Sequence, residues 1–325
     1  MKHSVTLIII IGFLFSCGKK ERSLKFKDFE KVDIKTLLKD STLNIRAFEI
    51  DDKEVGCFAT SQGKIGAVTK NLIDEEARLT FQLKDDTIIP NFRALAVTKK
   101  AGFILSIGSP ALLYKIDDDS LKIVYRENHE KVFYDAMDFW NAEEGIAIGD
   151  PTDNCLSIII TRDAGETWEK LSCDILPNTK EGEAAFAASD TNIAIVGDKT
   201  WISTGGKVSR ILFSPDKGKT WEVFETPIVQ GIETTGIYSL DFYDEDNGFA
   251  IGGDYTKPES KWNNKIRTQD GGKTWQVVAN NKAPGYRSCV QYIPNSDAKK
   301  LVAVGFKGID YSNITIINAL KTNCN

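Results

Sequence analysis

Short apolar stretches recur along this chain in a fixed order, and polar turns separate them. Each of six segments opens with a stretch in which small, apolar and polar residues alternate, which is typical of a half-buried β-strand. A continuous apolar run containing glycine follows, as expected for a strand covered on both faces. The opening stretches lie at residues 45–50, 92–97, 133–139, 184–188, 237–242 and 287–292, and the runs at 57–59, 103–108, 145–149, 193–197, 248–253 and 301–305. With no long helical pattern between them, these segments predict an all-β fold.

Three of the six segments carry the same motif between a third and a fourth predicted strand. The pattern [Ser/Thr]-x-Asp-x-Gly-x-Thr-Trp occurs at residues 161–168, 214–221 and 268–275, with its aspartates 53 and 54 positions apart. This period is long enough for one four-stranded sheet per copy, and regular periods of this kind indicate repeat architectures. We therefore predict a β-propeller of four-stranded antiparallel blades, with six repeats visible.

The residue types in the motif suit a hairpin turn. The aspartate can accept hydrogen bonds from the backbone N–H groups of the turn, and the glycine can adopt a positive φ. The tryptophan begins the return strand, where its ring can lie over the turn. We predict structural roles for Asp163, Gly165, Trp168, Asp216, Gly218, Trp221, Asp270, Gly272 and Trp275.

The sixth segment departs from this pattern. Ile314 and Ala319 stand where the motif would place its aspartate and tryptophan. Either the sixth blade ends irregularly, or the chain is a shortened form of a longer propeller whose ring is open. An open ring would expose two sheet edges.

The first residues of the chain have the features of an export signal. A short basic start precedes an apolar stretch that ends before Cys17, and it is too short to span a membrane. Cys17 follows a lipobox-like sequence, so we expect lipidation there, although simple cleavage after the apolar stretch stays open. The predicted organisation is a signal peptide at 1–16, a tether and lead-in strand at 17–43, and the propeller domain at 44–325. A lipid on Cys17 would anchor the protein to the membrane of the bacterial envelope.

Composition narrows the range of ligands. The chain has 325 residues and a formal net charge of −5, and this mild acidity argues against binding nucleic acid. Its two histidines, His3 and His129, exclude a histidine-rich metal site. The oxygen-rich stretch at 244–248 suits a plain turn better than a Ca²⁺ loop, because it lacks the terminal glutamate of such a loop. We expect no metal and no cofactor.

Two cysteines lie near each other in the predicted hairpin of the third segment. If the hairpin pairs Thr161 with Thr167, the same register places Cys155 opposite Cys173. Exported proteins commonly contain disulfides, and closing this loop would stabilise the fold by about 3 kcal/mol. Cross-strand geometry often disfavours such a bond, so the two thiols can also be free. Cys57 and Cys289 suit small apolar core positions.

The repeated motif resembles the Asp-box, or bacterial neuraminidase repeat, of sialidases and many other propellers. The stretch from residue 45 to 312 is also similar to propellers related to photosystem II stability/assembly factor, in the branch found as lipoproteins of Bacteroidetes-type bacteria. The residues that carry this second resemblance are those at 149–151, 158–163, 182–186, 213–221, 252–255 and 285–288. The resemblance implies a seven-bladed, non-enzymatic scaffold that binds another protein through one face.

Candidate ligand-binding residues lie on the opening strands of these segments. Arg46, Arg93 and Arg287 lie at the same end of these strands, and Arg210 lies near a neighbouring blade. If the strands line the axis, these arginines meet Glu183 and Asp135 at one mouth, where guanidinium groups could hold a carboxylate of an envelope protein or of another acidic ligand. Alternatively, each arginine pairs locally with an acid and joins neighbouring blades.

An enzymatic role is the alternative function. Sialidases grip a substrate carboxylate with three arginines and use a tyrosine and a glutamate as the nucleophilic pair, with an aspartate as acid. Arg93, Arg210 and Arg287 could take the first role, and Tyr238 and Glu183 the second. The spacing of these residues is not distinctive, and no Arg-Ile-Pro entry motif is present.

Overall fold

The computed structural model describes residues 34–51, 53–69, 80–118, 120–313 and 316–322, with side chains up to residue 312. All regular structure in these ranges is β-strand. No helix in them has the length and hydropathy needed to cross a membrane. The signal peptide, Cys17 and most of the tether lie outside the described residues.

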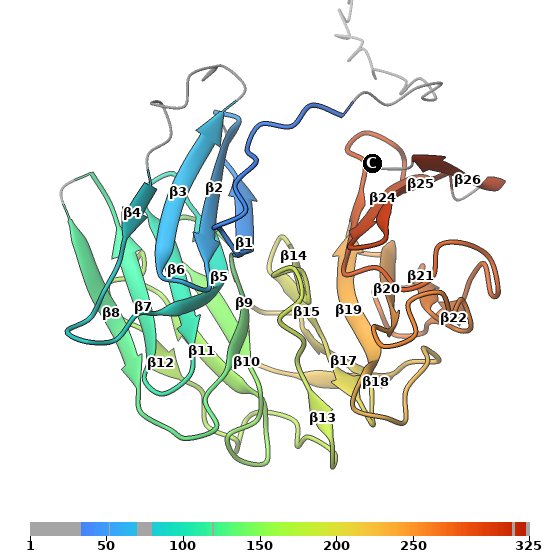
Figure 1. Ribbon diagram of the computed structural model, residues 1–325. Helices are drawn as coiled ribbons and strands as arrows, with labels where there is room; N and C mark the ends of the chain where they lie inside the picture. The colour runs from blue at the N-terminus through green and yellow to red at the C-terminus, as the bar shows by residue number, and fades with distance from the viewer. Residues whose placement is uncertain (1–33, 52, 70–79, 119, 314–315, 323–325) are drawn as a thin grey trace, which may run out of the picture.

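The strands form six antiparallel blades that follow one another about a common axis in chain order (Figure 1). Blade one holds β1 (Ile45–Ile50), β2 (Val55–Thr60), β3 (Lys64–Thr69) and β4 (Thr80–Gln82). Blade two holds β5 (Asn91–Val97), β6 (Gly102–Ile107), β7 (Ala111–Ile116) and β8 (Leu121–Glu127). Blade three holds β9 (Tyr134–Phe139), β10 (Gly145–Gly149), β11 (Ser157–Thr161) and β12 (Glu169–Lys170).

The second half of the chain repeats this order. Blade four holds β14 (Ile193–Val196), β15 (Lys199–Ser203), β17 (Arg210–Ser214) and β18 (Glu222–Glu225). Blade five holds β19 (Thr235–Phe242), β20 (Gly248–Asp254), β21 (Lys265–Thr268) and β22 (Gln276–Val277). Blade six holds β23 (Cys289–Tyr292), β24 (Lys300–Gly305), β25 (Gly308–Asn313) and β26 (Ile316–Thr322). The predicted all-β propeller of four-stranded blades is confirmed.

Several details differ from the sequence-based expectation. The described chain forms six blades, where the family resemblance implied seven, and β26 completes the sixth blade with a fourth strand. Residues 34–43 form no strand, so the described part of the predicted lead-in strand is irregular. The innermost strand of blade four is β14, which was predicted as the second strand. The predicted innermost stretch at 184–188 is mostly irregular, and only β13 (Glu183–Ala184) pairs there, with β16 (Gly205–Gly206) at the inner edge of blade five.

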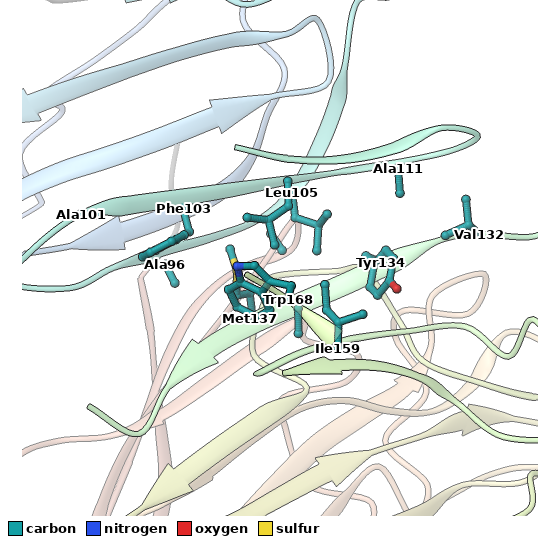
Figure 2. Packing of buried hydrophobic residues seen from close by; sticks show 13 residues of the cluster. Ala96, Ala101, Phe103, Leu105, Ala111, Val132, Tyr134, Met137, Ile159 and Trp168 are labelled. Carbon is teal, nitrogen blue, oxygen red and sulfur yellow. The ribbon is translucent and has the colours of Figure 1, made fainter. Parts of the chain in front are cut away.

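Apolar side chains from adjacent blades pack together at five junctions. At the junction of blades two and three, Phe103 and Leu105 from β6 face Met137, Ile159 and Trp168, as Figure 2 shows. Burying one such large side chain contributes roughly 1.5–3 kcal/mol. The hydrophobic core of the fold therefore lies between blades.

The junction of blade six with blade one differs from these five. Blade one turns Phe48 and Ile50 toward it, and their exposed fractions are 47% and 64%. Val304 on β24 is 40% exposed. No apolar cluster among the described residues joins these two blades, although Phe58, which pairs with Phe48, is only 1% exposed.

The three motif copies form the predicted turns. The Asp163 carboxylate accepts hydrogen bonds from the Thr167 N–H at 2.9 Å, the Thr167 hydroxyl at 2.6 Å and the Thr161 hydroxyl at 2.9 Å. Asp216 and Asp270 accept the same set from their own motifs. The motif glycines have φ between +76° and +85°. The Nε1–H groups of Trp221 and Trp275 donate to the carbonyl oxygens of Gly218 and Gly272, which places these two rings over their turns.

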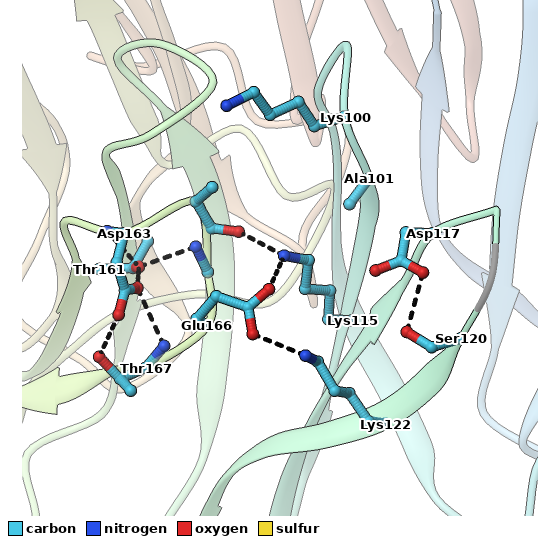
Figure 3. A network of polar contacts seen from close by, with 12 residues as sticks. Lys100, Ala101, Lys115, Asp117, Ser120, Lys122, Thr161, Asp163, Glu166 and Thr167 are labelled. Atoms are coloured by element: carbon cyan, nitrogen blue, oxygen red, sulfur yellow. Dashed lines mark hydrogen bonds and ion pairs between the residues drawn. The ribbon is translucent and has the colours of Figure 1, made fainter.

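Each motif also contacts the preceding blade. Figure 3 shows Lys115 of blade two, whose Nζ lies 2.9 Å from the carbonyl oxygen of Ala164 and 2.5 Å from Glu166 in the motif of blade three. Lys122 pairs with the same Glu166 at 2.6 Å. In blade four, Trp201 donates its Nε1–H to the carbonyl oxygen of Gly271 in the motif of blade five at 2.8 Å. The motif is therefore an interblade joint as well as a turn.

The predicted disulfide between Cys155 and Cys173 is present. The register that suggested it is shifted by one residue, because β11 and β12 pair Ile160 with Glu169, and the backbone of Cys155 pairs with Asn178 instead. Cys57 and Cys289 are free thiols and half-buried.

Candidate functional site

Four innermost strands carry a β-bulge near their first residues. The residue left without a cross-strand partner is Arg46 in β1, Arg93 in β5, Asp135 in β9 and Tyr238 in β19. A bulge turns the side chain of the extra residue away from the regular pleat, and bulges are common beside functional sites. The motif turns follow the last residues of third strands, which run parallel to the first. The four bulges therefore lie at the opposite end of the blades from these turns.

Arg46 and Arg93 converge on one carbonyl oxygen. The Nη2 atom of Arg46 lies 3.4 Å from the oxygen of Ala187, and the Nη1 atom of Arg93 lies 3.5 Å from it. The Nε atoms of both arginines are buried without a hydrogen-bond partner. Within the described ranges, neither arginine forms an ion pair with a carboxylate. Burial and the neighbouring Arg46 lower the pKa of Arg93, whereas Asp135 opposes this effect.

The carboxyl group of Asp135 lies near Arg93, and that of Asp150 lies near Asp135. Asp135 is fully buried, and neither carboxylate oxygen has a hydrogen bond of standard geometry. Burial and the nearby Asp150 raise the pKa of Asp135 well above its usual value, against the opposing effects of Arg93 and the Ala187 N–H. Burial also raises the pKa of Asp150 to about 6, although the Ala185 N–H donates to it at 3.0 Å. A raised pKa favours the neutral acid, so Asp135 offsets the charge of Arg93 less than a carboxylate of ordinary pKa would.

A cluster of aromatic rings lies beside these arginines. Phe186 stacks on Tyr238 at 4.2 Å between ring centroids, and Tyr286 meets Tyr238 edge to face at 4.8 Å. Phe306, which is 66% exposed, lies 5.5 Å from Tyr286. Burial raises the pKa of Tyr286 to about 12, and Arg46 acts in the other direction, so the rings and the arginines share one electrostatic environment. We call Arg46, Arg93, Asp135, Phe186, Tyr238 and Tyr286 the axial mouth.

Glycine permits the close approach that positions Phe186. A Cβ atom on Gly205 would lie 2.1 Å from the Phe186 ring, so no larger residue fits in β16 at this point. The β13–β16 pair thus holds the segment before β14 over the inner edge of blade five. Its residues 186 and 187 supply the stacked ring and the carbonyl oxygen of the axial mouth.

Arg210 and Arg287 do not join the arginines of the axial mouth. Arg210 binds Glu183 through two bonds of 3.0 Å and 2.6 Å, and both side chains are buried. Arg287 binds Asp310 within blade six at 2.6 Å and 2.7 Å. These two arginines follow the alternative interpretation, in which each pairs locally with an acid.

The sialidase arrangement is not assembled. Both oxygens of Glu183 are engaged by Arg210, and Thr204 also donates to Glu183 at 2.7 Å. The hydroxyl of Tyr238 donates instead to the carbonyl oxygen of Thr234 at 2.9 Å. Three arginines therefore do not meet around one point, and the proposed nucleophilic pair is separated by other contacts.

The opposite end of the innermost strands is acidic, which the sequence analysis did not predict. Burial raises the pKa of Glu49 to about 7, with a further contribution from Asp138, and burial raises those of Asp138 and Asp241 to about 6. The buried carboxylate of Asp190 accepts the N–H groups of Leu95 at 2.7 Å and Met137 at 2.9 Å. Asp190 thus ties β5 to β9, a long-range contact that sequence spacing does not reveal.

The described side chains form no recognisable metal-binding group. No group of three or more His, Cys, Asp or Glu residues among them could hold a metal ion. In the turn at 244–248, the Asp244 carboxylate accepts the N–H groups of Asp246 and Asn247, as a plain turn requires.

Comparisons with known proteins identify a fold and no family. No protein-family model matches the chain, and no curated protein matches it. A structure described as YCF48 bound to D1 peptide is 15% identical, with 85% of this chain and 94% of that chain covered and a TM-score of 0.41. A catalytically inactive virginiamycin B lyase from Staphylococcus aureus with quinupristin is 11% identical, with 87% and 88% covered and a TM-score of 0.57. The Pan2 WD40 domain of Neurospora crassa is 13% identical, with 84% and 76% covered and a TM-score of 0.54. The last two likenesses show that the chain is similar in fold to known β-propellers.

Proposed function

We propose that this protein is a lipid-anchored β-propeller of the cell envelope that binds another protein, without catalysis, through the axial mouth. The partner presents an acidic segment, and one of its carboxylates binds between Arg46 and Arg93. The two guanidinium groups supply planar donors that suit a carboxylate. The half-buried Phe186 and the exposed Phe306 supply an apolar surface beside the charge, and the buried Tyr238 and Tyr286 support these rings.

One observation carries this proposal. Two arginines at equivalent bulges point to the same carbonyl oxygen and have no carboxylate partner among the described residues. A partly buried guanidinium group without an anion is costly, and chains commonly neutralise such groups. Arg210 and Arg287 show that this chain does so elsewhere. A ligand that brings its own carboxylate would complete the contacts of Arg46 and Arg93.

A peptide pair can test the proposal. A fluorescent peptide rich in glutamate and tyrosine should bind the protein more tightly than its glutamine counterpart, and the Arg46→Gln/Arg93→Gln double variant should lose that preference. Arg126→Gln is the matched control, because Arg126 is more exposed and pairs with Asp85 away from the mouth. Equal binding of both peptides, or a preference retained by the double variant, would show that the mouth is not an acidic-segment site.

Two further assays address the anchor and the enzymatic alternative. Labelling of growing cells with a palmitate analogue should mark the natural chain and not a Cys17→Ser variant. Incubation with a fluorogenic sialoside should give no turnover above buffer. Turnover that disappears in the Arg93→Gln variant would contradict the non-catalytic role.

A further inference from the structure

A cavity lies between blades five and six, where the motif tryptophan is missing. Its volume is about 270 Å³, and its apolar walls are formed by Phe249, Ile251, Val278, Val290, Leu301 and Ala303. At three other junctions a tryptophan of the following blade packs into the core, namely Trp168, Trp221 and Trp275. Blade six has Ala319 at the corresponding position of its sequence. The cavity therefore occupies the interblade space that an indole ring fills elsewhere.

The register of the strands identifies which side chains face this space. In blade five, Phe249 pairs with Arg267 and Ile251 with Lys265. In blade two, the same positions pair Phe103 with Lys115 and Leu105 with Leu113. Arg267 thus corresponds to Lys115, and Lys265 corresponds to an apolar leucine.

Arg267 lacks the partner that Lys115 has. Lys115 reaches Ala164 and Glu166 in the motif of blade three (Figure 3). Blade six carries no such motif, and the Nε atom of Arg267 is buried without a hydrogen-bond partner. Arg267 lies near the phenol of Tyr292, and its charge and a hydrogen bond from it act to lower the pKa of Tyr292, against the larger effect of burial. Within the described residues Arg267 therefore has a neutral neighbour and no carboxylate partner.

Lys265 adds a second positive charge at the wall. The residue is 4% exposed, and its Nζ donates to three neutral oxygens, those of Asn264 at 2.6 Å, Lys282 at 2.9 Å and Pro284 at 2.8 Å. Asp310, the acid that lines the cavity, is bound to Arg287. The cavity thus combines apolar walls with two cations that form no ion pair within the described chain.

We propose that this cavity binds a small aromatic carboxylate, with its ring between Phe249 and Leu301 and its carboxylate at Arg267. A dry apolar cavity of about 150 Å³ is already large enough to hold benzene. A ring would restore the contacts that the motif tryptophan makes at other junctions. A carboxylate would supply the acceptor that Glu166 supplies to Lys115.

Indole-3-acetate and its neutral analogue indole-3-acetamide provide matched probes for calorimetry with the full chain. The acid should bind with a Kd below about 1 mM and about tenfold more tightly than the amide. Arg267→Gln should remove this difference, and Ala303→Leu, which fills the cavity, should remove binding of both probes. Arg93→Gln in the axial mouth should change neither affinity.

Three results would overturn the proposal. These are the absence of binding at millimolar probe, an acid preference that survives Arg267→Gln, and a preference that is lost in Arg93→Gln instead. If Ala303→Leu does not fold, the binding site can be located in the unsubstituted protein by nuclear Overhauser effects. Binding in the cavity should give such effects between the probe ring and the methyl groups of Ile251 and Leu301. Contacts to other methyl groups alone would exclude the cavity. The outcome is independent of the peptide assay at the axial mouth.

Discussion

Arg46, Arg93, Arg210 and Arg287 have the same charge and different surroundings. Arg210 and Arg287 each bind a buried acid, and such a pair mainly prevents the cost of an isolated buried charge. Arg46 and Arg93 share a single neutral acceptor among the residues described. An arginine of this chain is therefore held in an ion pair, or left able to bind a ligand, according to whether the fold brings an acid within reach of it.

The acids beside the axial mouth should make its ligand binding depend on pH. The pKa of Asp150 is raised to about 6 and that of Asp135 is also raised, so both groups gain negative charge as pH rises. The charge of Asp135 offsets that of Arg93, and Asp150 adds negative charge next to Asp135. We expect an acidic peptide to bind more tightly at pH 5.5 than at pH 8, measured by fluorescence polarisation. Asp150→Asn should reduce the dependence, and an unchanged profile would show that Asp150 does not act on the ligand.

Glu183 is expected to stabilise the fold without taking part in binding or turnover. Glu183→Gln would leave the buried Arg210 without its anion and should lower the free energy of unfolding by about 3 kcal/mol. The matched control is Glu181→Gln, because Glu181 is highly exposed in its pair with Lys207. Urea denaturation measures both variants. Equal stability of the two would contradict the structural role of Glu183.

The sequence identified the four arginines as candidates but could not show which of them pair with an acid in the fold. The position of Arg46 and Arg93 near the first residues of two predicted strands indicated both as candidate binding residues. The structure adds that both lie at bulges, which the sequence did not reveal. The same reasoning could not recognise the partners of Arg210 and Arg287. Glu183 and Asp310 lie 27 and 23 positions away in the chain, and sheet topology, not spacing, joins them. The role of Asp190 could not be predicted from the sequence, because the N–H groups that it accepts lie in two other blades.

At the scale of elements, the repeated motif couples a turn to an interblade joint. Its internal hydrogen bonds depend on local sequence, so three copies were enough to predict them. Its contacts with Lys115 and Trp201 depend on the preceding blade and could not be predicted from the motif alone. The short stretch at 184–188 was misassigned because its small residues alternate as an inner strand does, whereas the chain there bends to form the axial mouth.

Loss of one motif aspartate should destabilise the propeller without changing its mouth. Asp216→Ala removes the acceptor of the Thr220 N–H and hydroxyl and of the Ser214 hydroxyl, which should cost about 1–3 kcal/mol. Thermal denaturation measures the loss, and the peptide assay should give an unchanged affinity. Asp153→Ala, outside the motif, serves as control. A fall in peptide affinity at full folding would indicate that the motif contributes to binding.

At the scale of the whole molecule, buried acids around the axis should set the dependence of stability on pH. The folded-state pKa values of Glu49, Asp138 and Asp241 lie above their usual values of 4.5, 3.8 and 3.8. At these three groups the folded chain holds more protons than the unfolded chain at pH values between the usual and the raised pKa, and their contribution to stability falls as pH rises. Groups with a lowered pKa, such as Glu144, act in the opposite direction only at lower pH. We therefore expect the free energy of unfolding to decrease from about pH 5 to about pH 7.

Substitution of the group with the highest value provides the check on this dependence. Glu49→Gln should flatten the part of the profile near pH 6 to 7, because the amide does not titrate. Glu130→Gln, on the surface, should leave the profile unchanged. If the free energy of unfolding of the unsubstituted protein instead rises between pH 5 and 7, burial does not raise the pKa values of these acids as expected.

The junction of blade six with blade one also bears on where a further blade could be added to the fold. Among the described residues, Phe48, Ile50 and Val304 belong to no apolar cluster that joins blade six to blade one, whereas such clusters join the other five pairs of blades. A duplicated blade inserted there would gain apolar partners on both sides and would disrupt none of the existing ones. A further repeat between the chain's first and last sheets would therefore separate none of the apolar clusters found among the described residues.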